Sequence, residues 1–236
     1  MAYDFLGLVN DVNGRVNEPK LDESNFVNAG GYYSSAKEAV NSSLRAINQQ
    51  EYEWPFNHTQ VEEILVPGQV RYSFEPDAKT VDFESFRIKR NNDFGNDTRP
   101  LKRMDYEVYL QHYNDSEYNA DTTVRRLPTL VFQTQDMNYG IYPPPDKPYE
   151  LHYEYFSLPV DLELPTDVPS VPEPFRHVIV DGAMYYVYHF RGDIDTADRM
   201  HQKFKEGVDN LRKIYINRYT RMRDGRVFHG GYRNAV

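Results

Sequence analysis

Proline is distributed unevenly along this chain. Of its 15 prolines, 12 fall between Pro55 and Pro169, one is Pro19, and two, Pro172 and Pro174, come directly before a long apolar stripe. Proline lacks a backbone N–H, so it is excluded from helix interiors and from central strands. Both ends of the chain can therefore be helical, whereas the middle cannot contain long helices.

Two long antiparallel helices are predicted over residues 172–222. Apolar and aromatic residues recur there at spacings of three and four, which is the period of one helix face. Gly192 separates the two stripes, and Asp193 or Asp195 can cap the second helix. The predicted core of this pair is Phe175, Val178, Ile179, Gly182, Tyr186, Met200, Phe204 and Leu211.

The N-terminal end predicts two more helices. Asp4 can cap a helix that ends before Pro19, and a second stripe runs from Tyr33 to Ile47. An amphipathic helix needs a partner to bury its apolar face. We therefore expect residues 1–52 and 170–222 to form one helical bundle, with a C-terminal arm over 223–236.

The middle of the chain changes to a period of two, which predicts strands. Pro67-Gly68 predicts a hairpin between the first two strands, and a slip in the alternation predicts a bulge in the third. Residues 91–100 and 114–122 are polar and are expected to be loops. The predicted strands are 61–66, 69–74, 81–88, 104–110, 129–133, 139–142 and 149–155. The predicted fold class is α+β, a discontinuous helical bundle with an inserted sandwich- or barrel-like β-rich module at 53–169.

Catalytic chemistry is not indicated. The chain has no cysteine, which excludes disulfides and thiolate ligands, and it contains no nucleotide-binding, zinc-protease or calcium-loop motif. His177 with Asp181, and His189 with Asp193, are spaced for weak ion pairs rather than metal ligation. We interpret His189 as a hydrogen-bonded core or interface histidine, and expect Glu62 and Glu63 to face solvent with ordinary pKa values. The sequence predicts no catalytic residue, no metal and no cofactor.

The net charge of −9 conceals an asymmetry. From Arg199 onward there are ten basic and three acidic residues, whereas the preceding 198 residues hold 17 basic and 33 acidic ones. A like-charged block at a chain end is typical either of an interaction arm or of a solvated helix face. The acidic body disfavours specific nucleic-acid binding. No apolar run approaches 18 residues, and no basic leader opens the chain, so we expect synthesis in the cytosol.

Several segments together resemble bacteriophage head–tail adaptor or connector proteins similar to tail tubular protein A. A tyrosine-rich strand after a triple-proline run leads through a proline linker to a helix pair, as in that family. The segments that carry the resemblance are 9–13, 39–42, Trp54, 141–146, 149–155, 171–183 and 196–211.

The resemblance implies a structural virion protein that forms a ring, usually of twelve copies, beneath the portal and lines the DNA-ejection channel. Its partners would be the portal protein, tail tube, nozzle or sheath-terminator proteins, and in some tails the fibres. Genomic DNA would pass through without specific binding. The arm implied to bind the portal contains Arg221, Arg223, Arg226, Phe228, His229, Tyr232 and Arg233.

An alternative function from a different class remains open. Twenty tyrosines accompany one tryptophan, and a tyrosine-rich sheet could stack against sugars as a carbohydrate- or cell-surface-binding module of a phage tail. Ring formation would favour the adaptor, whereas monomeric glycan binding would favour the alternative.

Overall fold

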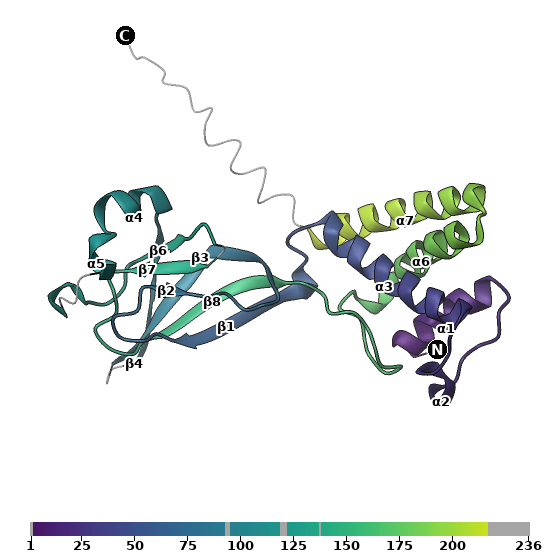
Figure 1. The fold of residues 1–236 in the computed structure, drawn as a ribbon, viewed down its shortest axis with the longest axis horizontal. Helices are drawn as coiled ribbons and strands as arrows, with labels where there is room; N and C mark the ends of the chain where they lie inside the picture. The colour runs from purple at the N-terminus through teal and green to yellow at the C-terminus, as the bar shows by residue number, and fades with distance from the viewer. Residues whose placement is uncertain (1, 93–94, 119–121, 137, 217–236) are drawn as a thin grey trace, which may run out of the picture. The chain divides into compact units, whose positions relative to one another are not determined.

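The computed structural model describes residues 2–92, 95–118, 122–136 and 138–216. The chain forms two compact units, one from residues 1–57 together with the chain from 159 onward, and one from residues 58–158 (Figure 1). Helices and strands are both present, so the α+β prediction is confirmed. The units divide at 57/58 and 158/159, rather than at the expected 52/53 and 169/170.

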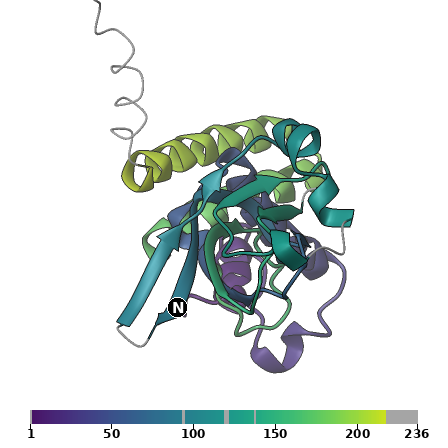
Figure 2. The ribbon, with the colours of Figure 1, turned by 90° about the vertical axis from the view of Figure 1, so that its left-hand side faces the viewer.

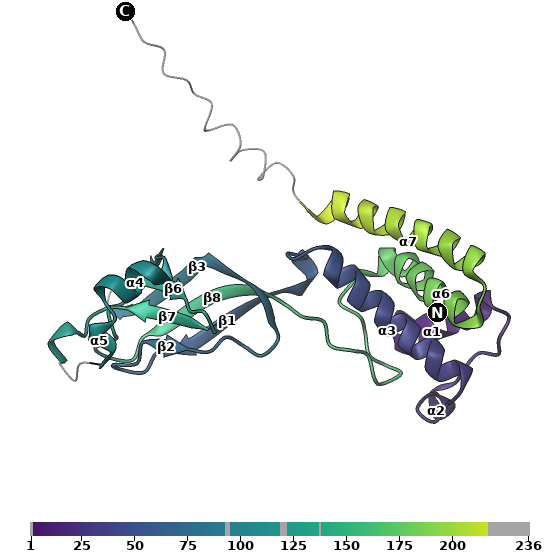
Figure 3. The same ribbon diagram turned by 45° about the horizontal axis from the view of Figure 1, so that its top comes forward.

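The first unit is helical and is centred on α6. Its elements are α1 (Phe5–Arg15), α2 (Glu23–Phe26), α3 (Tyr32–Gln50), the short turns η1 (Pro55–Asn57) and η3 (Glu173–Phe175), α6 (Arg176–Arg191) and α7 (Ile194–Tyr215). Helix α6 contacts α3, α7 and α1, and Figures 1 and 3 both show it between α3 and α7.

The helix ends follow from local sequence. The Asp4 carboxylate accepts a hydrogen bond from the Gly7 N–H at 2.7 Å, which caps α1. Gly192 ends α6 with φ of 79°, a left-handed conformation that favours glycine. Asp193, and not Asp195, caps α7 by accepting from the Thr196 N–H at 3.1 Å. These predicted boundaries are confirmed, except that α7 is described only to Tyr215.

Close packing at one glycine joins three of these helices. A methyl group built on Gly182 of α6 would lie 2.2 Å from Ser43 Oγ of α3 and 2.7 Å from the Phe204 ring of α7. Helices approach this closely only where a residue has no side chain. Of the eight residues expected in the core, six are buried, and Tyr186 and Met200 are half-buried against them.

Residues 159–171 form an extended strap that belongs to the helical unit. The Asn41 side chain donates to the Leu162 carbonyl at 3.0 Å and accepts from its N–H at 3.1 Å. On α1, the Phe5 N–H donates to the Asp167 carbonyl of the strap at 2.8 Å. Leu162 is buried among the helices. These bonds replace a strand ladder, which is why the strap does not extend the β-module.

Trp54 extends the helical unit beyond α3. Its indole is fully buried and donates to the Ile47 carbonyl at 2.9 Å, and its ring stacks on Phe56 with centroids 5.2 Å apart. The Asn57 amide then donates to the Asn48 side chain. Residues 53–57 are therefore fixed to α3 rather than to the first strand.

The second unit is a β-module whose described residues form eight strands in two four-stranded sheets. Sheet A has the order β1-β8-β3-β4, and sheet B has the order β2-β7-β6-β5, where β5 and β6 run parallel. The strands are β1 (His58–Ile64), β2 (Arg71–Tyr72), β3 (Ala78–Asn92), β4 (Gly95–Pro100), β5 (Lys102–Arg103), β6 (Leu130–Gln133), β7 (Tyr139–Tyr142) and β8 (Glu150–Ser157).

Aromatic side chains fill the space between the two sheets. Tyr153 and Phe86 of sheet A stack with centroids 4.8 Å apart, and both pack against Tyr139 of sheet B. Helix α4 (Tyr106–His112) covers the other face of sheet B, where Tyr109 stacks on Phe132 at 4.0 Å. The module is therefore a sandwich with a helix on one side.

Four sequence-based predictions about the module were wrong. Residues 61–74 form no hairpin, because β1 pairs with β8 and β2 pairs with β7 in the other sheet. Residues 104–110 are mainly helical, since Tyr106, Tyr109 and Tyr113 place rings on one face at helical spacing. Residues 95–100 pair with β3 as a strand. The segment 114–122, which was expected to be a loop, contains the short helix α5 (Asp115–Tyr118) and ends where the turn η2 (Thr122–Val124) begins.

Other strand predictions are confirmed. Strands β6, β7 and β8 lie where the alternation placed them, and β3 has register shifts against β8 between Asp82 and Arg87, close to the predicted bulge. Figure 2 shows the β3–β4 hairpin at one margin of the module.

Gly182→Ala should destabilise the helical unit. The added methyl group has no room between Ser43 and Phe204, and overpacking of this kind costs about 1–3 kcal/mol. Gly14→Ala in α1 is the matched control, because nothing lies within 4 Å of its added carbon and alanine favours helix by about 1 kcal/mol. Urea unfolding of both variants checks this, and equal stability of Gly182→Ala and wild type would contradict the packing argument.

Candidate functional site

The tyrosine-rich sheet does not present a stacking surface. Tyr139, Tyr153 and Tyr155 of the sandwich are at most 4% exposed, and Tyr72 is 5% exposed. The ring faces that would contact a sugar are therefore covered by the opposite sheet. Burial also raises the pKa of Tyr72 to about 12. The alternative function as a carbohydrate platform loses the feature on which it was based.

A carboxylate is held among these tyrosines. Glu63 lies on the inward side of β1 and accepts a hydrogen bond from the Tyr139 hydroxyl at 2.5 Å. Burial raises the pKa of the Glu63 carboxyl, the Tyr139 hydrogen bond opposes that shift, and Glu75 adds to it. The expectation that Glu63 faces solvent with an ordinary pKa was wrong. Alternation was the usable signal, because Val61 and Glu63 share one face of the strand.

The outer face of sheet A carries ion pairs between adjacent strands. His58 Nε2 lies 3.0 Å from Glu154, and Lys89 Nζ lies 2.8 Å from Glu150. The hydrogen bond to Lys89 lowers the pKa of Glu150. His152 lies between two carboxylates, with Nδ1 3.4 Å from Glu62 and Nε2 2.8 Å from Glu150.

The Glu62, Glu150 and His152 ligand atoms lie within 4.8 Å of one another, the spacing of a metal site. However, the two carboxylates face different nitrogens of the His152 ring. A metal ion bound to one ring nitrogen would therefore be close to only one of the two carboxylates. Lys89 also occupies the Glu150 carboxylate. The geometry favours a network of ion pairs.

The histidines on α6 do not enter the core. His177 and His189 are both exposed, so the core alternative for His189 was wrong, and the interface alternative stays a prediction. His189 lies in the last turn of α6. Its i+4 partner Asp193 instead caps α7.

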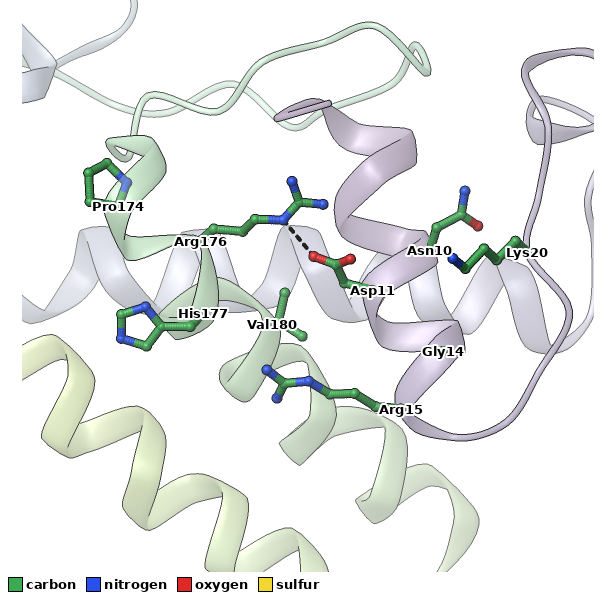
Figure 4. A pocket seen from close by; sticks show the side chains of 9 residues that line it. All are labelled: Asn10, Asp11, Gly14, Arg15, Lys20, Pro174, Arg176, His177 and Val180. Carbon is green, nitrogen blue, oxygen red and sulfur yellow. Dashed lines mark hydrogen bonds and ion pairs between the residues drawn. The ribbon is translucent and has the colours of Figure 1, made fainter. Parts of the chain in front are cut away.

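A pocket of about 540 Å³ lies between α1 and α6 in the helical unit (Figure 4). Its charged side chains are Arg15, Lys20, Arg176 and Asp11, and His177 lies at its rim. Arg176 Nε donates to Asp11 at 2.5 Å, and its Nη1 donates to the Ala2 carbonyl at 2.8 Å.

The pocket carries more positive than negative charge. Arg15 pairs with Asp181 on α6, and Arg176 pairs with Asp11 on α1, so each arginine joins the two helices. Lys20 forms no ion pair with any described residue. The arrangement contains no nucleophile beside a base, and what it offers chemically is attraction for a carboxylate.

Two groups of exposed apolar side chains lie at the α6–α7 turn and on the strap of the helical unit. Phe190 and Ile194 flank the α6–α7 turn and are 69% and 49% exposed. On the strap, Val160, Leu164 and Val168 are also exposed, whereas Leu162 between them is buried. Exposed apolar side chains of this size mark candidate protein-contact surfaces. The predicted arm residues 221–233 lie outside the described part of the chain.

A comparison with protein-family models decides the class of protein. The model described as SU10 adaptor protein matches residues 3–227, which is nearly the whole chain. The chain belongs to the SU10 adaptor protein family. A search of curated proteins finds no match.

Family membership confirms the resemblance to phage head–tail adaptors. A member of the SU10 adaptor protein family has a structural role in the bacteriophage virion, among portal and tail proteins, and the family suggests a structural rather than an enzymatic protein. Among the described residues, no helix has the length and apolar character needed to cross a membrane.

The Glu63–Tyr139 pair should make stability depend on pH in an unusual direction. A carboxyl whose pKa is higher in the folded state than in the unfolded state takes up a proton on folding, so stability falls as the pH rises through that window. Glu63→Gln removes this loss and keeps an acceptor for Tyr139. We expect the variant to gain stability relative to wild type at pH 7, and the gain to vanish at pH 4.

Tyr139→Phe should have the opposite effect. It removes the hydroxyl that hydrogen-bonds the Glu63 carboxylate, which costs about 1–3 kcal/mol at pH 7 and less at pH 4. Urea unfolding at both pH values measures the two variants together. A cost that is the same at pH 4 and pH 7 would show that the hydrogen bond does not depend on the charge of Glu63.

Proposed function

We propose that this protein is the head-to-tail adaptor that forms a ring beneath the portal, joins capsid to tail and lines the DNA-ejection channel. The observation that carries the proposal is the family match over residues 3–227. We propose a ring of twelve copies, synthesis in the host cytoplasm, and assembly into the neck of the virion. No cofactor, metal or catalytic residue is part of the proposal.

The organisation of the chain supports an adaptor. Two compact units offer two sets of contacts. The helical unit exposes Phe190, Ile194 and the apolar strap residues, and it also carries a basic pocket. We propose that these surfaces contact neighbouring copies, and that the tail tube, nozzle or sheath-terminator proteins, and fibres where present, attach to the β-module.

The C-terminal arm is proposed to bind the portal. Residues 223–236 carry three arginines and one aspartate, with Phe228 and Tyr232 among them. Aromatic side chains that enter apolar pockets commonly hold most of an interface's energy, and arginines at the rim add electrostatic complementarity. The remaining proposed arm residues are Arg221, Arg223, Arg226, His229 and Arg233.

The proposed passage of DNA without specific binding agrees with the charge of the chain. A net charge of −9 repels phosphate at long range. Repulsion of this kind suits a channel wall along which a genome must slide. We also propose a functional division of the chain into three parts. These are the bundle (1–52 with 170–222), the β-module (53–169) and an arm (223–236) that acts separately from the bundle.

Deleting residues 223–236 should abolish portal docking without unfolding the protein. Among the described residues, those buried in the helical core end at Leu211, so we expect the thermal midpoint to change little. Co-sedimentation of the truncated and full-length proteins with purified portal measures docking. Undiminished docking of the truncated protein would overturn the assignment of the arm.

A charge-reversal variant separates the two kinds of contact. Arg226→Glu with Arg233→Glu should weaken docking less than the deletion does, and the loss should shrink as salt screens the charges. Phe228→Ala with Tyr232→Ala should weaken docking at every salt concentration. Loss of binding in the arginine variant alone would indicate a purely electrostatic contact.

A further inference from the structure

Sheet A ends in two open edges, β1 and β4. Strand β1 pairs with β8 over its full length, from His58 to Ile64, and with no other described strand. The Leu65 N–H donates to the Tyr149 carbonyl, just before β8, at 2.8 Å. In an antiparallel pair every second residue bonds to the partner strand, so the odd-numbered residues of β1 bond to β8. Gln60, Glu62 and Ile64 therefore direct their backbone N–H and C=O groups away from the sheet.

The β4 edge has the same arrangement. The Leu101 N–H donates to the Phe86 carbonyl at 2.9 Å, so the neighbouring alternate residues, Thr98 and Pro100, direct their backbone groups outward. Pro100 has no backbone N–H, but at this position an N–H would point away from β3, so the pairing with β3 loses no hydrogen bond. Thr98 is opposite Lys89, on the outer face that also carries Glu62.

The two edges are compatible with each other. All neighbouring strands in sheet A are antiparallel, and their number is even, so β4 runs opposite to β1. A second copy placed beside the first to continue the sheet would bring its β1 alongside β4 as an antiparallel pair. On both edges the residues with outward backbone groups carry outer-face side chains, so such a pair would keep the polar face outside and the apolar face inside.

Charge changes sign across the sheet. On the outer face, Glu62, Glu150 and Glu154 lie on β1 and β8, whereas Arg87 and Lys89 lie on β3, next to β4. Arg87 is exposed and forms no ion pair with a described residue. The β4 side of one copy therefore complements the β1 side of another, where Glu62 and the 70%-exposed Ile64 lie.

We propose that copies of this chain associate head to tail by pairing the β1 edge of one copy with the β4 edge of the next. The contact joins different surfaces of the two copies, so it generates a ring when the rotation closes, and closure leaves neither edge open. The inference rests on the self-assembly proposed above and assigns it a surface in the β-module.

Disulfide trapping tests the pairing directly, because the chain has no cysteine of its own. Thr98→Cys is combined in turn with Gln60→Cys, Glu62→Cys or Ile64→Cys, which samples three registers. Opposite residues of antiparallel strands have Cα atoms about 4.5–5.5 Å apart, within disulfide range. Under oxidation, we expect at least one combination to give a ladder of covalent dimers, trimers and larger species.

The control variants separate a head-to-tail contact from chance collision. Each single-cysteine variant should give no ladder, and Thr98→Cys with Lys203→Cys on the exposed side of α7 should give none. Dimers from Glu62→Cys alone would instead indicate a β1–β1 contact and overturn the proposal.

A proline variant gives a second readout without cysteine. Gln60→Pro removes an outward N–H and leaves the bonds to β8 intact, so it should lower the association constant about tenfold while Gln60→Ala does not. Mass photometry of the wild-type chain, alone and with purified portal, reports self-assembly independently of the edges. Rings that form without a ladder would overturn the edge pairing and leave the proposed function standing, whereas the absence of both would contradict each of them.

Discussion

The structure depends on the packing of α6 against helices that lie far away in the sequence. Its Gly182 contacts Ser43 of α3, about 140 residues earlier, and Phe204 of α7, which follows the turn at Gly192. Because a module of about a hundred residues separates α3 from α6, bringing the two helices together costs conformational entropy, and favourable interactions must offset that cost. Close helix packing, the buried Trp54 and the hydrogen-bonded strap together offset this entropic cost.

The strap and Trp54 also separate the two units energetically. Both ends of the insertion are fixed to the helical unit before the first strand and after the last, through the Ile47 carbonyl on one side and Asn41 on the other. The β-module has its own aromatic core, and the Glu63–Tyr139 bond lies inside it. Changes on the surface of either unit can therefore alter contacts with partners without disturbing the other core.

Much of the helical unit could be predicted from the sequence because its signals are local. Asp4, Gly192 and Asp193 fix helix ends within a few residues, and stripes at helical spacing identify the buried faces.

The sandwich was harder to predict, since strand pairing is not local. Pro67-Gly68 indicates a turn, yet β1 finds its partner at Tyr153, about 90 residues later, and no turn residue encodes that choice. The inward position of Glu63 was readable from alternation, but its pKa shift required the opposite sheet. The pocket between α1 and α6 required tertiary contacts that no spacing within one helix reveals.

Adaptor function follows from the family and from surfaces, not from a catalytic centre, so its most direct test is to see the protein in place. Cryo-electron microscopy of the purified virion neck can locate every copy. We expect a ring of this chain between portal and tail, with residues 221–233 against the portal and the helical units around the channel. A neck in which this chain is absent, or in which it lies outside the portal–tail junction, would contradict the account.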